Sequence, residues 1–334
     1  MEILSSNNYV STENMQQDFA GIKDAISLPS SGTAVEFQVG DILISNIRPY
    51  LKKIWLSDRN GGCSTDVLAL RAKNEKVDSS FLYCCLANDD FVSYVMSGAK
   101  GVKMPRGDKQ HILSYNLGVP SVQEQRRIAE LVSLLEKRIS AQSKIIEEQE
   151  TLLKSLADKL FLQNNHSCQL SELVNIEKGK QLNADTLSET GDYYVMNGGI
   201  TPSGYYSEYN VHAGAISISE GGNSCGYVQF NEKPFWSGGH CYSLQCRTNL
   251  VDYKYIYYYL KTKEADVMAL RIGSGLPNIQ KKDIEKFTIS YPSLQLQKQF
   301  VKVLDELSGK INTEKNLLEK YCQQKSYLLS QMFI

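Results

Sequence analysis

Two short basic stretches in the first half of the chain carry the residue types that bind nucleic-acid phosphates. Each stretch, 45–59 and 98–110, holds four cations against a single aspartate. The cations are Arg48, Lys52, Lys53 and Arg59 in the first stretch, and Lys100, Lys103, Arg106 and Lys109 in the second. Lys and Arg bind phosphate oxygens, and Arg and Asn also read base edges in the major groove. The pattern predicts a nucleic-acid contact, although short charge runs are also common on solvated surface loops.

Polar and aromatic side chains in both halves extend this candidate interface. In the first half they are Asn14, Asn46 and Tyr50. In the second half the candidates are the cations Lys178, Lys180, Arg271 and Lys281 and the polar residues Asn197, Tyr205, Tyr206, Asn223 and His240. The alternative is that the Gly-, Ser- and Tyr-rich loops between 185 and 239 simply pack on themselves. Exposed loops of this composition are where partner contacts usually lie.

Catalytic and metal-binding motifs are weak by comparison. The chain has neither a GxxxxGK[ST] nor a GxGxxG phosphate-binding loop, and it has no HExxH sequence. Cys225, His240, Cys241 and Cys246 do not have the spacing of a standard zinc site. We therefore expect no catalytic residues, no metal and no cofactor in this chain, which is predicted to read a ligand without catalysing a reaction.

The elements that must position these residues form two similar mixed domains. In the first, residues 40–48, 65–72 and 113–120 are predicted strands, and residues 79–98 are a predicted helix. In the second, the predicted strands are 214–220, 241–247 and 287–292, and the predicted helix is 252–270. The fold class expected is α/β (mixed α+β).

A long helix follows each domain. Residues 121–161 contain no Gly or Pro and have seven acidic and seven basic residues. At this length the helix is about 60 Å long, which is typical of a coiled coil. Its predicted packing residues are Ile128, Leu131, Leu135, Ile139, Leu152 and Leu156. In the second helix they are Phe300, Val303, Leu307, Ile311, Leu318 and Tyr321.

The whole arrangement occurs twice. Pro120 and Gln125 are matched by Pro292 and Gln297, 172 positions later. The chain is therefore predicted to contain a first globular domain (1–120), a long helix (121–161), a second globular domain (162–292) and a second long helix (293–334).

Composition limits the remaining possibilities. The net charge of −1 means that a nucleic-acid partner must be bound by local basic patches. The eight cysteines include no CxxC pair, and no apolar run approaches the length of a membrane span. We expect a cytoplasmic protein without a membrane partner.

Taken together, these features resemble the specificity subunit of type I restriction-modification systems. The tandem of globular domain and Pro-led helix carries the resemblance, and three segments are similar to those of that family: residues 9–15 (YVSTENM), 40–49 (GDILISNIRP) and 120–128 (PSVQEQRRI). PSLQLQK at 292–298 is a fourth. The likeness covers nearly the whole chain.

The resemblance implies a fold and a function. Each globular unit would be a target-recognition domain for one half of a bipartite, asymmetric DNA site. The two helices would pack antiparallel, in a pseudo-twofold arrangement, as a ruler that fixes the gap between half-sites. Two modification subunits and the restriction subunits would be the protein partners, and S-adenosylmethionine, ATP and Mg would be bound by them.

Two expectations accompany this interpretation. Residues 170–174 (LSELV) open the second domain with a segment that has almost no counterpart at the start of the first. We therefore expect the first recognition domain to be trimmed, or the start to be internal. The alternative function is a non-catalytic coiled-coil scaffold or interaction protein without DNA readout. Loop cations that share one face would favour DNA, whereas scattered cations would favour the scaffold.

Overall fold

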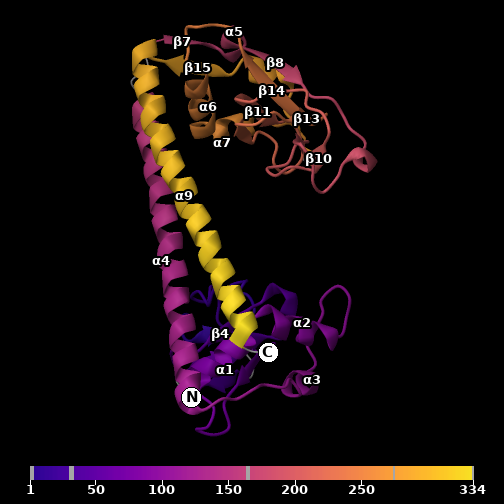
Figure 1. The fold of residues 1–334 in the computed structure, drawn as a ribbon, viewed down its shortest axis with the longest axis vertical. Coiled ribbons are helices and arrows are strands. Elements are labelled where there is room, and N and C mark those ends of the chain that lie inside the picture. The colour runs from indigo at the N-terminus through magenta and orange to yellow at the C-terminus, as the bar shows by residue number, and fades with distance from the viewer. Residues whose placement is uncertain (1–3, 30–33, 163–165, 274, 333–334) are drawn as a thin grey trace. The chain divides into compact units, whose positions relative to one another are not determined.

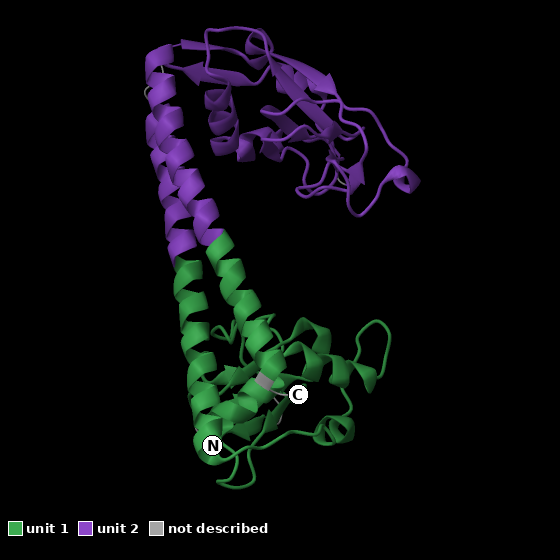
Figure 2. Cartoon of the chain, in the orientation of Figure 1, with its two compact units in different colours: residues 1–144, 316–334 green, residues 145–315 purple. Residues whose placement is uncertain are grey.

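The computed structural model describes residues 4–29, 34–162, 166–273 and 275–332, and the chain divides into two compact units. Unit 1 comprises residues 1–144 and 316–334, and unit 2 comprises residues 145–315 (Figure 2). Each unit therefore contains one globular domain and part of both long helices. No described helix is long and apolar enough to cross a membrane.

The sheet at the centre of unit 1 has three antiparallel strands. They are β3 (Ile42–Ser45), β4 (Ile54–Leu56) and β6 (Val67–Leu70), in the order β4-β3-β6. A second small sheet has the order β1-β5-β2 and contains Tyr9–Val10, Gly61–Cys63 and Val35–Phe37. The strands predicted at 40–48 and 65–72 are thus present as β3 and β6.

Three short helices cover this sheet. They are α1 (Ser79–Leu86), α2 (Asp89–Ser97) and α3 (Lys109–Leu113). The single helix predicted over 79–98 is interrupted because the Asn88 side chain accepts a hydrogen bond from the Phe91 amide (2.9 Å) and starts a new helix. The strand predicted at 113–120 is absent, because no described segment of unit 1 pairs with these residues.

Unit 2 repeats this sheet with one more strand. β11 (Ala215–Ser219), β12 (Val228–Asn231), β14 (Cys241–Cys246) and β8 (Val174–Lys178) form an antiparallel sheet in the order β12-β11-β14-β8. A second sheet has the order β10-β9-β13, from Tyr205–Tyr206, Tyr193–Met196 and Trp236–Ser237. β15 (Thr288–Tyr291) pairs with β7 (His166–Gln169).

The helices of unit 2 are α5 (Leu170–Leu173), α6 (Tyr253–Thr262), α7 (Glu264–Ala269) and α8 (Lys281–Glu285). In Figure 1, α6 and α7 lie beside the sheet, and Tyr255, Ile256 and Leu260 of α6 are fully buried in the core. The predicted strands 214–220, 241–247 and 287–292 are present, and the predicted helix 252–270 is divided at Lys263. Unit 1 also contains a 3₁₀ turn at Pro49–Leu51, and unit 2 contains one at Ala184–Thr186.

The two long helices are α4 (Val122–Phe161) and α9 (Leu294–Met332). Within unit 1, Glu136 forms an ion pair with Lys325 (2.6 Å), and the Arg138 guanidinium lies 4.9 Å from the centre of the Tyr321 ring. Within unit 2, Glu150 pairs with Lys315 (2.6 Å). Contacts that move forward along α4 move backward along α9, so the helix segments in each unit are antiparallel.

The buried face of the helices differs from the predicted one by a small rotation. Phe300 and Ile311 are buried as predicted, whereas Ile128, Leu135, Ile139, Leu156, Leu307, Leu318 and Tyr321 are half-buried. Leu131, Leu152 and Val303 were also predicted to pack and are 40%, 56% and 45% exposed in this single chain. Their places are taken by Ala129, Val132, Ala157, Val301 and Leu304. Ala129 and Val132 pack with Cys84 of α1 and Leu329 of α9, so the globular domain covers part of this helix face, which the apolar stripe alone did not show.

A buried glutamine fixes the start of α4 against the domain that precedes it. Gln125 is fully buried, and its side-chain oxygen accepts a hydrogen bond from the Asp78 amide (2.8 Å). Its side-chain nitrogen donates to the carbonyl oxygens of Lys76 (2.8 Å) and Pro120 (2.9 Å). Since Asp78 also caps α1, one amide side chain connects the starts of two helices.

The same arrangement recurs in unit 2. The buried Gln297 accepts from the Asp252 amide (2.8 Å) and donates to the carbonyl oxygens of Pro292 (2.8 Å) and Leu250 (3.4 Å). Asp252 caps α6. The Pro-x-x-x-x-Gln spacing of both helix starts thus has a physical function, which is to satisfy buried backbone groups where the helix meets the domain.

Candidate nucleic-acid interface

Unit 1 brings its two basic stretches together as a pair of hydrogen-bonded loops, 46–53 and 100–107. Isolated β-bridges join Ile47 to Arg106 and Lys100 to Arg106. The Arg48 amide donates to the carbonyl of Pro105 (2.8 Å), and the Gly107 amide donates to that of Asn46 (3.1 Å). We call these segments the loop pair of unit 1. Arg48 and Arg106 therefore lie in adjacent loops although they are 58 positions apart in sequence.

Three cations of this loop pair are available to a ligand. Arg48, Lys103 and Arg106 are exposed. Arg106 lies 3.2 Å from Asp66 in a pair that is itself exposed. Within the described residues, Arg48 and Lys103 form no ion pair or side-chain hydrogen bond. Tyr50, 47% exposed, adds an aromatic face to the same loop. Arg48 has a left-handed backbone (φ 52°), which is rare for a residue with a side chain.

The other predicted residues of unit 1 are engaged within the protein. Asn14, predicted as a DNA contact, is buried, and its side-chain nitrogen donates to the carbonyls of Tyr9 (3.0 Å) and Lys23 (2.9 Å). Lys53 donates to the Thr12 carbonyl (2.6 Å), and Lys52 pairs with Asp89 (2.7 Å).

Arg59 and Lys100 are also partly committed, whereas Asn46 is not. Arg59 pairs with Asp58 (2.6 Å). Lys100 pairs with Asp108 (2.8 Å), and this contact, with the backbone amides that Asp108 caps, lowers the pKa of the Asp108 carboxyl to about 2. The side-chain oxygen of Asn46 is buried and has no hydrogen-bond partner among the described residues.

Unit 2 has an equivalent loop pair, 220–227 and 272–279, with the same backbone hydrogen bonds. Gly221 and Ile272 each form a β-bridge with Asn278. The Gly222 amide donates to the Pro277 carbonyl (3.0 Å), as Arg48 does to Pro105. Gly222 has a φ of 76°, close to the left-handed φ of Arg48. The two loop pairs are thus one backbone design that occurs twice.

Their side chains differ. The positions of Arg48, Lys103 and Arg106 are held in unit 2 by Gly222, Gly275 and Asn278. The predicted cations Lys180, Arg271 and Lys281 lie outside the loop pair of unit 2. Arg271 and Lys180 are exposed, and Lys281 lies 3.6 Å from Glu285. Asn223 is exposed on the first loop. Two similar backbones therefore present different charges and hydrogen-bonding groups.

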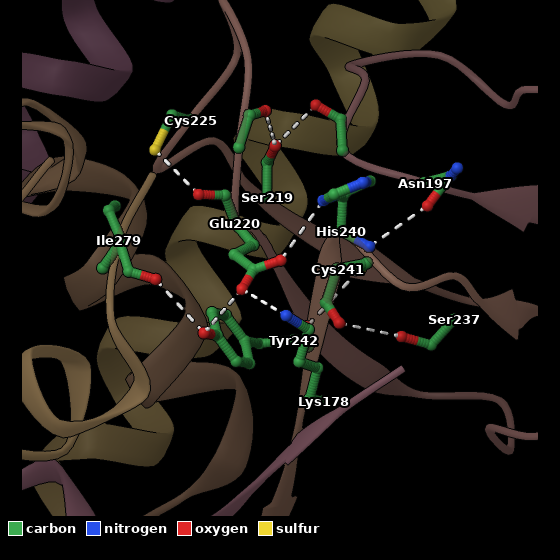
Figure 3. Close-up of polar contacts among 12 residues, drawn as sticks. Lys178, Asn197, Ser219, Glu220, Cys225, Ser237, His240, Cys241, Tyr242 and Ile279 are labelled. Carbon is green, nitrogen blue, oxygen red and sulfur yellow. Dashed lines mark hydrogen bonds and ion pairs between the residues drawn. The ribbon is translucent and has the colours of Figure 1, made fainter. Parts of the chain in front are cut away.

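A network around Glu220 supports the first loop of unit 2 (Figure 3). Glu220 is only 8% exposed, and its carboxylate accepts hydrogen bonds from Lys178 (2.6 Å) and the Tyr242 hydroxyl (3.1 Å). His240 lies 3.4 Å from the second carboxylate oxygen. Burial, with the neighbouring Glu220 charge, raises the pKa of Tyr242. Lys178 and His240 thus hold the loop from one side, and both remain partly exposed beside it.

The remaining predicted residues of unit 2 pack near this network. The Asn197 side-chain oxygen accepts from the His240 amide (3.1 Å). Tyr205 pairs with Ser188 across a β-bridge, and the Tyr206 ring packs edge-on against Trp236 at 5.2 Å between ring centres. Asn197, Tyr205 and Tyr206 are half-buried, so these loops pack partly on themselves, as the alternative interpretation of the sequence allowed.

Replacing Tyr242 with Phe tests the importance of this network. Because the hydroxyl is buried and satisfies a buried carboxylate, its removal is expected to cost about 1–2 kcal/mol of unfolding free energy. Urea denaturation measures this. The matched control is Tyr193→Phe, which removes a half-buried hydroxyl with no hydrogen bond to a described residue and is expected to change stability by less than about 0.5 kcal/mol. Equal stability of both variants would contradict the proposed support of the loop by Glu220.

The first loop of unit 2 contains a sequence pattern that surrounds the nucleophilic serine in many hydrolases. It was not among the motifs considered above. Residues 222–226 read Gly-Asn-Ser-Cys-Gly and match the Gly-x-Ser-x-Gly pattern. The pattern lies between the antiparallel strands β11 and β12, not on a strand-to-helix turn, and Ser224 has no hydrogen bond to a described histidine. Within the described residues, no cluster of His, Cys, Asp and Glu is suited to a metal ion.

Comparison with known proteins agrees with the duplicated architecture. The family model described as type I restriction modification DNA specificity domain matches residues 7–150 and 164–320. A putative type I specificity subunit of Mycoplasma genitalium is 28% identical over 195 residues, covering 54% of this chain and 49% of that protein. One of Mycoplasma pneumoniae is 33% identical over 152 residues, covering 45% and 40%. Each alignment thus spans half or less of the curated relative.

A crystal structure supports the fold. The type I restriction-modification S subunit from M. genitalium has a TM-score of 0.71, with 20% identity, covering 100% of this chain and 92% of that one. A chain from a structure describing assembly of the type I system has a TM-score of 0.56 at 21% identity, covering 97% and 90%. Since the family model matches both halves, the chain belongs to the type I restriction-modification DNA specificity family.

Proposed function

We propose that this chain is the DNA target-recognition subunit of a type I restriction-modification complex. Each unit would bind one half of a bipartite target through its loop pair. The observation that carries the proposal is the duplicated loop pair, in which one backbone displays three exposed cations in unit 1 and mainly Gly and Asn at the same positions in unit 2. Different side chains on equivalent backbones favour two different half-sites, and therefore an asymmetric target.

The protein partners follow from the same proposal. The chain would be non-catalytic by itself, and methyl transfer and cleavage would be carried out by modification and restriction subunits. S-adenosylmethionine, ATP and Mg²⁺ would be bound by those subunits. Two modification subunits would match the internal duplication, one for each unit. The long helices would set the gap between the half-sites, as a spacer between two readers.

The test is a methylation map. The chain is co-expressed with its neighbouring modification subunit in a methylation-free host, and modified bases are located across the genome by single-molecule sequencing. A split, asymmetric motif with a fixed gap is expected. Exchanging residues 1–120 for those of a relative should then change one half of the motif only. A stable complex that leaves the genome unmethylated would contradict the proposal, and failure to form any complex would favour the scaffold alternative.

A further inference from the structure

The residue that precedes β14 in unit 2 and the residue that precedes β6 in unit 1 hold equivalent places beside the two loop pairs. The Glu220 amide donates to the His240 carbonyl (2.9 Å), and the Asn46 amide donates to the Asp66 carbonyl (2.8 Å). His240 therefore corresponds to Asp66, as Glu220 corresponds to Asn46. One backbone position beside each loop pair thus carries an imidazole in unit 2 and a carboxylate in unit 1.

Each of these side chains faces a charged group of its own loop pair. Asp66 lies 3.2 Å from Arg106, and Nδ1 of His240 lies 3.4 Å from Oε2 of Glu220. Both side chains remain accessible, since they are 37% and 62% exposed. The signs are reversed, because the loop pair supplies the cation in unit 1 and the carboxylate in unit 2. His240 can therefore bring positive charge to the loop pair of unit 2.

The imidazole of His240 is held on one side and open on the other (Figure 3). Its main-chain amide donates to the Asn197 side-chain oxygen (3.1 Å), and its Nδ1 faces Glu220. Nε2, on the opposite side of the ring, has no hydrogen bond to a described residue, and the side chain is exposed. A Cβ at Gly221 would lie 3.9 Å from Nδ1, and one at Gly222 would meet no heavy atom within 4 Å. The two glycines therefore add no side chain that would cover the ring.

The charged and titratable groups around His240 come from the first loop, β8 and β14. Oε1 of Glu220, on the first loop, accepts from Lys178 of β8 (2.6 Å) and from the Tyr242 hydroxyl of β14 (3.1 Å). Oε2 faces His240. A carboxylate oxygen beside Nδ1 favours the form of the ring that carries a proton there, because a lone pair on Nδ1 would face negative charge. Glu220 therefore sets which ring nitrogen is protonated first.

This arrangement gives the two charge states of the ring opposite hydrogen-bonding character at Nε2. In the neutral ring with its proton on Nδ1, Nε2 is an acceptor, and in the imidazolium it is a donor. Histidine ordinarily changes charge between about pH 5 and about pH 8. In the major groove, guanine presents its O6 acceptor where adenine presents its N6 amino donor. A donor at Nε2 therefore suits guanine, and an acceptor suits adenine.

We propose that His240 is a specificity-determining residue of unit 2 that reads guanine when its ring is protonated, and that Glu220 is the residue that positions it. This role rests on the proposed function and adds to it the base and the protonation state at one position of the unit 2 half-site. The imidazolium donates from Nε2 to guanine O6. As the pH rises, the ring loses its charge, Nε2 becomes an acceptor, and the preference for guanine over adenine declines. Unit 1 carries Asp66 at this place, and aspartate ordinarily titrates far below this range, so the equivalent position of unit 1 should show no such change.

The experiment uses the complex of the full chain with its modification subunit and the target found by the methylation map. The exchange of residues 1–120 assigns the unit 2 half-site, and each G·C pair of that half-site is replaced in turn by A·T. Affinity is measured by fluorescence anisotropy at about pH 6 and about pH 8, at one salt concentration. At one position, the preference for guanine is expected to fall about tenfold between the lower and the higher pH. Because the result is a ratio between two duplexes, pH effects common to both cancel.

Three variants test the roles of the two residues. His240→Gln removes the titrating ring, and the guanine preference should no longer change with pH. Glu220→Gln keeps a side-chain oxygen for Lys178 and Tyr242 but removes the charge beside Nδ1, and it should reduce the change. The matched control is His212→Gln, at an exposed histidine of unit 2 outside the loop pair, and it should behave as the parent. Thermal denaturation checks the folding of all three.

Several results would overturn the role of His240 and leave the proposed function intact. They are a guanine preference that is constant with pH, a pH dependence that persists in His240→Gln, and a unit 2 half-site without guanine. An equal pH effect on all duplexes that His240→Gln abolishes would assign His240 to a phosphate and would also overturn base reading. An unchanged pH dependence in Glu220→Gln would overturn the positioning role. Binding without sequence preference by the parent complex would overturn the proposed function, and the role of His240 with it.

Discussion

Replacing Arg48, Lys103 and Arg106 together with Ala is expected to weaken binding to the target duplex by about 100-fold, because each substitution removes a cation from one loop pair. The salt dependence should also become less steep, by about one unit for each phosphate that is no longer bound. Affinity would be measured by fluorescence anisotropy at several salt concentrations, on the duplex identified by the methylation map.

A matched variant separates the loop pair from general charge. Lys23, Lys73 and Lys76 are exposed cations of unit 1 outside the loop pair. Their joint replacement with Ala removes the same net charge and is expected to change affinity by less than about threefold. Thermal denaturation of both triple variants checks that folding is intact. If the two variants lose affinity equally, or if the first retains both its affinity and its salt dependence, the loop pair is not the DNA contact of unit 1.

Replacing Gln297 with Leu is expected to destabilise unit 2 by about 3 kcal/mol. The substitution leaves the part-buried Asp252 amide and the buried Pro292 carbonyl without their partner, and an unsatisfied buried group costs about 1–3 kcal/mol. The control is Gln295→Leu, two positions earlier on the same helix and exposed, which is expected to be nearly neutral. Urea denaturation measures the loss of unfolding free energy, and hydrogen exchange shows in which unit the loss occurs. Equal stability of the two variants would show that the buried amide does not hold the helix start.

The Gln297→Glu variant adds a pH dependence. Burial without a cation partner is expected to raise the pKa of the introduced carboxyl, and only its protonated form can donate to the Pro292 carbonyl. A raised folded-state pKa means that stability is retained below the unfolded-state pKa and is lost as the pH rises through the folded-state value. Gln297→Glu should therefore be closest to the parent at low pH, whereas the deficit of Gln297→Leu should not follow this titration. A deficit of Gln297→Glu that is constant with pH would indicate that the site is open to water.

The duplicated helix starts show how far the sequence alone leads. The paired Pro-x-x-x-x-Gln motifs, together with helical runs free of Gly and Pro, were sufficient to predict two long helices and a twofold repeat. They could not show that Gln125 and Gln297, and not the equally matched Gln123 and Gln295, are the buried ones. Which glutamine is buried depends on the face that each long helix turns toward α1 or α6. The residues that make this contact, Asp78 and Asp252, lie about 45 positions earlier in the chain.

The candidate interface shows the same difference between what the local sequence predicts and what tertiary contacts decide. Residue type and local charge were enough to locate both basic stretches and the polar loops of the second half. Which cations remain available was decided by their neighbours: Lys52 lies against Asp89 and Lys53 against the Thr12 carbonyl, while Arg48 and Lys103 have no such partner among the described residues. Nothing in the local sequence indicated that Arg48 adopts the left-handed backbone of Gly222.

The sequence by itself therefore determined most of the elements, the repeat and the chemistry of the loops, since these depend on periodicity and composition within one segment. Only the tertiary structure decided which helix face is buried and which loops pair. Those outcomes depend on contacts between segments that are distant in the chain, where backbone hydrogen bonding and close packing select one arrangement from several that the local sequence permits.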